Sequence, residues 1–301
     1  ADTPGHEQYT RNMITAASTA SVAILLVDAR AGLMMQTRRH AFLNSIVGIR
    51  HVVLAVNKLD LVDYKQSVFD SISEAFEAFA KPLGFTSITA VPISALKGDN
   101  ITTRSAKMPW YKGPTLMGYL ETIDPSPQEM STAAFPVQWV NRPNANFRGY
   151  SGTVVAGSIE IGQQLRVVPS GETAAVKDIV LSKNSLSRAV ADQAVTITLD
   201  KELDISRGDV LVAADAPCEV SDQFEVTLVW MDQEPGFIGR SYWLLLGTSR
   251  VNATITSIKF KYDINKFEKL SSDTMQLNDI GEVNLSLDKP IAFEHYKDCK
   301  G

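Results

Sequence analysis

The segment His51-Val-Val-Leu-Ala-Val56, continued directly by Asn57-Lys58-Leu59-Asp60, is the strongest indication of the fold class of this chain. After His51, the five residues up to Val56 are apolar and rich in β-branched side chains, as is typical of a strand buried on both faces of a parallel sheet. The pattern recurs twice, each time with a polar residue directly after the run: Val22 to Val27 before Asp28, and Ile88 to Ile93 before Ser94.

Amphipathic segments separate these runs. In the longest of them, Phe69, Ile72, Phe76 and Phe79 share one helical stripe. Strands that alternate with helices predict an α/β domain with a parallel sheet and right-handed crossovers. The expected helices are Glu7 to Ala17, Gln36 to Val47, Ser67 to Leu83 and a short one from Leu116 to Ile123.

The pattern changes at the linker-like sequence Asp124-Pro-Ser-Pro-Gln128. Beyond it the chain offers only short strand-like runs punctuated by glycines, which indicates antiparallel β-barrels. We therefore predict a parallel-sheet α/β domain at 1–125, a β-barrel domain at 126–220 and a second, incomplete β-barrel domain at 221–301. The expected strands are 135–140, 150–156, 164–168, 175–181, 194–199, 223–231, 241–246, 249–261 and 279–287.

The composition is that of an ordinary globular protein. The net charge of −5 is unfavourable for binding nucleic acid. No apolar run reaches the roughly 18 residues that a membrane span needs. Cys218 and Cys299 lack metal-ligand spacing and are interpreted as reduced thiols. These features predict a cytoplasmic protein without a nucleic-acid or membrane partner.

The polar residues after the strands are the candidate site, because ligands of open α/β sheets bind at the carboxyl ends of the strands. The Asp60 carboxylate can accept two hydrogen bonds from guanine, whereas adenine offers no donors there. Asn57 can brace neighbouring loops, and the Lys58 stem can lie over the base. The backbone of Ser94-Ala95-Leu96 could touch the base as well. Taken alone, each segment also reads as an ordinary turn.

A third segment, Asp2-Thr3-Pro4-Gly5-His6, has the chemistry of a γ-phosphate site. Asp2 can hold Mg²⁺ through water, and Gly5 allows its amide to approach a phosphate closely. His6 can orient an attacking water and is the single catalytic candidate. A plain turn is the alternative. All three segments occur in the order and placement found in GTP-binding domains, so we predict GTP and Mg²⁺ as cofactors.

One expected motif is missing from the sequence. The phosphate-binding Gly-x-x-x-x-Gly-Lys-Ser/Thr loop occurs nowhere in the chain, and in such domains it precedes the Asp-x-x-Gly segment. The chain also begins at Ala1 without a methionine. We therefore expect a fragment that by itself binds GTP weakly or not at all.

Asp2 to Met13 resembles the translation-factor class of GTPases, through Pro-Gly-His and the later Asn-Met. The form Glu-Gln-Tyr-Thr-Arg-Asn-Met is similar to the large GTP-binding subunit of sulfate adenylyltransferase. The similarity covers essentially the whole chain, although the family's first strand, phosphate loop, first switch and last strands lie outside it. Further matching stretches are 28–32, 36–40, 57–64, 94–101, 108–116, 136–143 and 147–152.

The resemblance implies a GTPase subunit that couples GTP hydrolysis to the uphill formation of adenylyl sulfate and pyrophosphate from ATP and sulfate. It implies a smaller catalytic ATP-sulfurylase subunit as the partner, in a heterodimer or higher assembly. The alternatives are a translation factor that delivers aminoacyl-tRNA and a non-enzymatic interaction module.

Aromatic residues leave further questions open. Trp110 and Tyr111 either pack over the α/β domain or anchor an interface. We expect Trp139, Trp230 and Trp243 in the core or at a domain interface.

Overall fold

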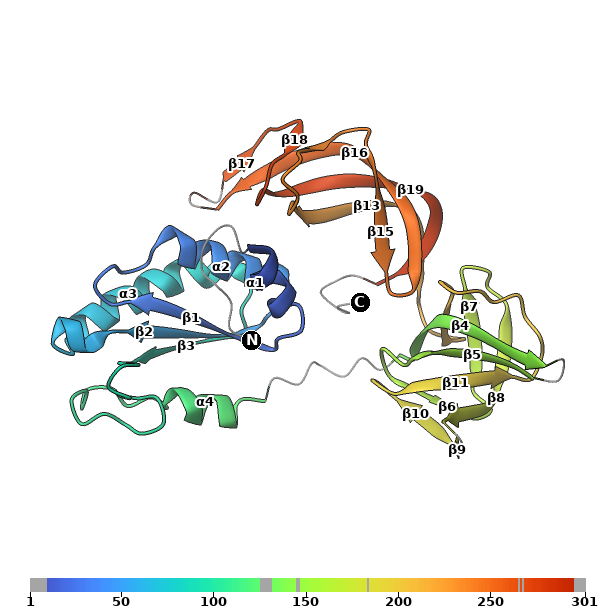
Figure 1. Ribbon diagram of the computed structural model, residues 1–301, viewed down its shortest axis with the longest axis horizontal. Coiled ribbons are helices and arrows are strands. Elements are labelled where there is room, and N and C mark those ends of the chain that lie inside the picture. Colours follow the sequence, from blue (N-terminus) through green and yellow to red (C-terminus); the bar gives the residue numbers. More distant parts are fainter. Residues whose placement is uncertain are drawn as a thin grey trace.

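The computed structural model describes residues 10–124, 132–144, 147–182, 184–264, 266 and 268–294, which form an α/β unit followed by two antiparallel β units (Figure 1). The α/β unit is built on a parallel sheet in the order β1 (Val22–Asp28), β2 (His51–Asn57) and β3 (Ser87–Pro92). The central strand is fully buried from Val52 to Val56, which confirms the expectation of a strand covered on both faces.

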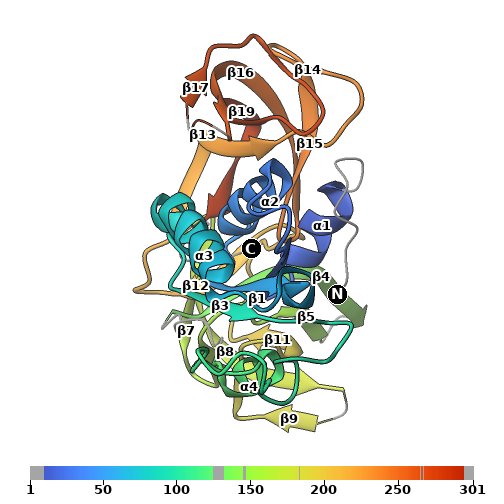
Figure 2. The same cartoon turned by 90° about the vertical axis from the view of Figure 1, so that its left-hand side faces the viewer.

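Helices cover the two faces of this sheet (Figures 1 and 2). α1 (Thr10–Ala17), α2 (Met35–Ile46) and α3 (Gln66–Ala80) pack over Val52, Leu54 and Val56 in one apolar cluster. α4 (Leu116–Thr122) lies on the opposite face, where Leu116 and Tyr119 pack against Val53 and Ala55. The stripe of Phe69, Ile72, Phe76 and Phe79 is buried, as the helical periodicity predicts. Two single turns, η2 (Leu59–Val62) and η3 (Lys81–Leu83), follow β2 and α3.

The first β unit is a closed barrel. Its sheet has the order β11-β5-β4-β12-β7-β8-β9, and an additional pairing of β11 with β8 joins the ring. The ring surrounds one apolar cluster that includes Phe135, Tyr150 and Ile179. The strands are β4 (Ala134–Asn144), β5 (Phe147–Thr153), β6 (Ser158–Glu160), β7 (Gln164–Val168), β8 (Thr173–Leu181), β9 (Asn184–Leu186), β10 (Arg188–Val190), β11 (Ala194–Leu199) and β12 (Val210–Ala213), with β6 paired to β10.

The second β unit contains an antiparallel sheet in the order β13-β19-β16-β15, with β17 paired to β16. No pairing among the described residues closes this sheet into a ring, in contrast to the first unit. It contacts the α/β unit: the Tyr262 ring lies edge-on to Phe42 of α2, and Arg11 of α1 donates to the Met231 carbonyl at 2.8 Å. The strands are β13 (Glu219–Val229), β14 (Gly236–Phe237), β15 (Ser241–Leu246), β16 (Ser249–Asp263), β17 (Glu268–Leu270), β18 (Thr274–Met275) and β19 (Ile280–Phe293).

The tryptophans divide between core and surface. Trp139 and Trp243 are 62% and 59% exposed, so the expectation of a place in the core or at a domain interface was wrong for both. Trp243 lies on an outward-facing position of β15 by ordinary strand alternation. In β4 the register shifts between Val137 and Trp139, and this irregularity places Trp139 outward although Phe135 and Val137 face the core. Trp230 is half-buried against the core of the second β unit, whereas Trp110 packs on Phe69 of α3 and thus covers the α/β unit.

Several predictions fall outside the described residues: the segment Asp2 to His6, the start of the helix expected from Glu7, most of the linker at 124–128, and Cys299. Cys218 is a free thiol, as expected. The boundaries proposed at 125/126 and 220/221 stay predictions. No helix in the described ranges is long and apolar enough to cross a membrane.

Candidate functional site

The candidate site lies along the carboxyl-terminal edge of the parallel sheet. Because β1 and β2 pair in register with Asp28 opposite Asn57, the polar residues that end these strands are direct neighbours. Ile93, the residue after β3, donates its backbone N–H to the Val56 carbonyl at 2.8 Å, so Ser94 is brought to the same edge. The sheet register thus assembles three segments that are far apart in the sequence.

The chain turns sharply after β2. Lys58 adopts a left-handed conformation with φ 65°, which a non-glycine residue rarely takes. The turn is fixed from the other side, because the Leu59 side chain is fully buried and its N–H donates to the Ile93 carbonyl at 3.2 Å. This geometry brings Asp60, in η2, close to the segment that follows β3.

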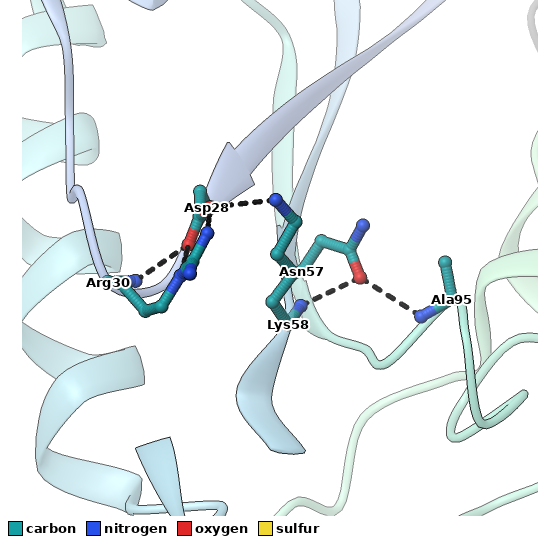
Figure 3. A network of polar contacts seen from close by, with 5 residues as sticks. All are labelled: Asp28, Arg30, Asn57, Lys58 and Ala95. Atoms are coloured by element: carbon teal, nitrogen blue, oxygen red, sulfur yellow. Dashed lines mark hydrogen bonds and ion pairs between the residues drawn. The ribbon is translucent and has the colours of Figure 1, made fainter. Parts of the chain in front are cut away.

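Asn57 joins the two loops of the site (Figure 3). Its side-chain Oδ1 accepts from the Lys58 N–H at 2.7 Å and from the Ala95 N–H at 2.9 Å. This is the bracing role expected of the asparagine. The Ala95 amide, which the sequence suggested as a base contact, is therefore engaged by Asn57, while the Leu96 side chain is 84% exposed.

Ser94 positions the carboxylate of Asp60. Ser94 is fully buried, and its hydroxyl donates to Asp60 Oδ1 at 2.6 Å. A carboxylate has about four acceptor positions, so this single hydrogen bond leaves the group able to accept further donors. Asp60 is only half-buried, which leaves the carboxylate accessible to a ligand.

An ion cluster lies beside these loops, where the Asp28 carboxylate contacts two cations (Figure 3). Its Oδ2 lies 2.6 Å from Arg30 Nη2 and 2.9 Å from Lys58 Nζ. Hydrogen bonds from Arg30, reinforced by Lys58, hold the pKa of the Asp28 carboxyl well below its usual range. The strand-end position marked Asp28 as a candidate, but Arg30 carried no comparable signal in the sequence.

The ion cluster predicts an acid-dependent stability. A depressed native pKa stabilises the fold above the unfolded-state pKa of about 4, and the contribution is lost as the pH falls below that value. We expect Asp28→Asn to lower the unfolding temperature by about 2 °C at pH 7 in calorimetry, because partly exposed pairs contribute little. The difference from the wild type should shrink below about pH 4.

The matched control for this measurement is Asp204→Asn, which changes an exposed aspartate in the first β unit. This control substitution should leave the unfolding temperature unchanged at pH 7 and below about pH 4. A deficit of Asp28→Asn that grows as the pH falls would contradict the assignment.

The remaining predicted site residues, Asp2, Thr3, Pro4, Gly5 and His6, lie outside the described residues. Within the described ranges no group of three or more His, Cys, Asp or Glu side chains is placed to hold a metal ion.

An open parallel sheet with Asn-Lys-x-Asp and Ser-Ala segments at its carboxyl edge, followed by antiparallel β units, defines the translation-factor class of GTP-binding proteins. Residues 1–181 match the family model of the elongation factor Tu GTP binding domain, and residues 223–301 match that of the GTP-eEF1A C-terminal domain. The chain belongs to the elongation factor Tu GTP-binding domain family.

Curated relatives match over the full length of the chain. It is 48% identical to the sulfate adenylyltransferase subunit 1 of Saccharophagus degradans, covering 100% of this chain and 64% of the relative. It is equally 48% identical to the bifunctional enzyme NodQ of Rhizobium sp. strain BR816, covering 48% of that protein, and 49% identical to the bifunctional enzyme CysN/CysC of Xylella fastidiosa. The chain thus spans only about half to two thirds of the length of these relatives.

The solved structures with similar folds include sup35 complexed with GDP, at a TM-score of 0.53 and 22% identity over 95% of this chain and 74% of the other. This likeness supports the fold that the sequence predicted.

Proposed function

We propose that this chain is part of the GTPase subunit of a sulfate adenylyltransferase. In this function, GTP hydrolysis is coupled to the formation of adenylyl sulfate and pyrophosphate from ATP and sulfate. The observation that carries the proposal is the match of the whole chain, at 48% identity, to relatives named sulfate adenylyltransferase subunit 1. The geometry of Asp60 and its supports adds a physical basis for selecting guanine.

Guanine selection follows from the chemistry of Asp60. The N1–H and the exocyclic amine of guanine form a pair of donors that one carboxylate can accept, and charge-assisted hydrogen bonds of this kind are strong. Ser94 and Asn57 hold the two loops in place before a ligand arrives. The Lys58 stem is proposed to cover the face of the base, with its ammonium held by Asp28.

The roles of Asp2 to His6 also belong to the proposal. Asp2 would hold Mg²⁺, which would neutralise phosphate charge. Gly5 would present its amide to the γ-phosphate, and His6 would orient the attacking water. The proposal places ATP and sulfate chemistry mainly on a smaller catalytic subunit, in a heterodimer or higher assembly, in the cytoplasm and without nucleic acid or membrane.

The decisive experiment is a reconstitution. We expect the natural full-length protein, purified by affinity tag, to bring down a small ATP-sulfurylase subunit rather than tRNA. The complex should form adenylyl sulfate and pyrophosphate in a GTP-dependent manner, and a non-hydrolysable GTP analogue should not support the reaction. Co-purification of aminoacyl-tRNA, with no effect of GTP on adenylyl sulfate formation, would instead favour a translation factor.

A further inference from the structure

A second cluster of polar contacts lies behind the candidate guanine site, centred on Tyr64. Asp63 and Tyr64, the two residues after η2, both have positive φ, at 55° and 54°. The left-handed region is unfavourable for a large aromatic residue. Such backbone conformations persist only where surrounding contacts fix them, and they concentrate at functional sites.

Tyr64 is held by both its backbone and its side chain. Its N–H donates to the Leu59 carbonyl at 2.8 Å, and its carbonyl accepts from Trp110 Nε1 at 3.1 Å. Its hydroxyl donates to Asp99 Oδ2 at 2.9 Å and accepts from Lys107 Nζ at 3.1 Å. We name Tyr64, Asp99 and Lys107 the Tyr64 clamp.

Asp99 connects the clamp to Ser94. The backbone N–H of each of these two residues donates to the carbonyl of the other, at 3.2 Å from Ser94 and 3.1 Å from Asp99. The second carboxylate oxygen of Asp99 accepts from Ser105 Oγ at 2.7 Å, which fixes the side chain. The backbone of Asp99 is therefore coupled directly to that of Ser94.

The contacts form a closed ring that includes the carboxylate of Asp60. From Asp60 the ring passes along the backbone to Tyr64, across the hydroxyl to Asp99, through the paired backbone to Ser94, and back through the Ser94 hydroxyl. In this ring the Tyr64 hydroxyl is the only side-chain link, among the described residues, between the segment after η2 and Asp99. Removal of that hydroxyl would open the ring.

We propose that Tyr64 is a positioning residue for base recognition: through Asp99 and Ser94 it sets where the Asp60 carboxylate meets the donors of the base. The inference rests on the proposed guanine site. It assigns to Tyr64 no contact with the nucleotide. Its expected effect is therefore on the hydrogen bond that the Asp60 carboxylate accepts from the exocyclic amine of guanine.

The test compares GDP with inosine diphosphate (IDP), which lacks that exocyclic amine, in calorimetric titrations of the natural full-length protein. We expect the wild type to bind GDP about 10-fold more tightly than IDP, as one charge-assisted hydrogen bond allows. In Tyr64→Phe this preference should fall by about 3- to 5-fold, because GDP affinity drops while IDP affinity changes little. A general loss of structure would lower the affinities for GDP and IDP by the same factor.

The matched control is Tyr119→Phe, which removes a hydroxyl that contacts Ser87 Oγ at 3.1 Å on the far side of the sheet. It should leave the GDP preference unchanged. If Tyr64→Phe does not fold, Lys107→Met tests the same cluster, with an expected reduction of the preference of about 2-fold.

An unchanged preference in Tyr64→Phe, or an equal loss for GDP and IDP, would overturn the positioning role alone. A reduction of the same size in Tyr119→Phe would overturn it as well. A wild-type protein that binds GDP and IDP equally would overturn the proposed guanine site itself. The failures of the two proposals are therefore distinguishable.

Discussion

In the natural full-length protein, Asp60→Asn is expected to exchange the base preference, with GDP affinity lower by roughly 100-fold because two hydrogen bonds to a charged acceptor are lost. The asparagine amide would present a donor where the carboxylate presents an acceptor. Xanthine carries an oxygen in place of the exocyclic amine of guanine, so xanthosine diphosphate should become the preferred ligand. Ser94 Oγ can still donate to the remaining side-chain oxygen, so the loop should keep its conformation.

Competition titrations with GDP and xanthosine diphosphate measure this exchange. Asp63→Asn is the matched control, because the Asp63 side chain lies three residues further on and is 85% exposed. The control should keep the preference for GDP. Retention of GDP preference in Asp60→Asn would show that another group reads the base.

Asn57→Ala is expected to weaken both the fold and the site. One side-chain oxygen accepts from the Lys58 and the Ala95 N–H, so alanine removes the acceptor that joins the two loops. We expect a loss of unfolding free energy of about 1–2 kcal/mol, because both amides lie near the surface and water can replace part of the interaction. GDP affinity should fall by roughly 30-fold, since the loops must then be ordered on binding.

Thermal unfolding and GDP titration together test the role of Asn57. Asn57→Asp retains an acceptor oxygen at the same position, so it should preserve more of the stability than alanine does. If the two variants have the same unfolding temperature and GDP affinity, the hydrogen bonds of Asn57 do not contribute to holding the two loops together.

Much of the fold was predictable because burial leaves a direct signature in the sequence. The run at 52–56 is apolar at every position, since β2 is covered by helices on both faces. The aromatic stripe of α3 has helical periodicity because it packs on that sheet. By contrast, β6, β9 and β10 have three residues each, too few for any period to emerge from the glycine-rich turns around them.

The candidate site likewise contains residues that the sequence predicted and contacts that it did not. Strand ends identified Asn57, Asp60 and Ser94, and the structure brings them together. Contacts across 35 and 43 residues of sequence, from Tyr64 to Asp99 and to Lys107, leave no local pattern. No signal in the sequence pointed to Arg30 either. An arginine after a strand looks like an ordinary surface residue until its contact with Asp28 is seen.

The amino-acid sequence was enough to predict parallel strands that end in the residues of the proposed guanine site, because residue types and strand order are local properties of the chain. Which side chains hold Asp60 and Lys58 became visible in the folded chain. The ion pair of Lys58 with Asp28 depends on the register of β1 and β2, and the hydrogen bond from Ser94 to Asp60 depends on the packing of the loop after β3 against the η2 turn. That packing follows from sheet register and buried side chains together, and no single segment encodes it.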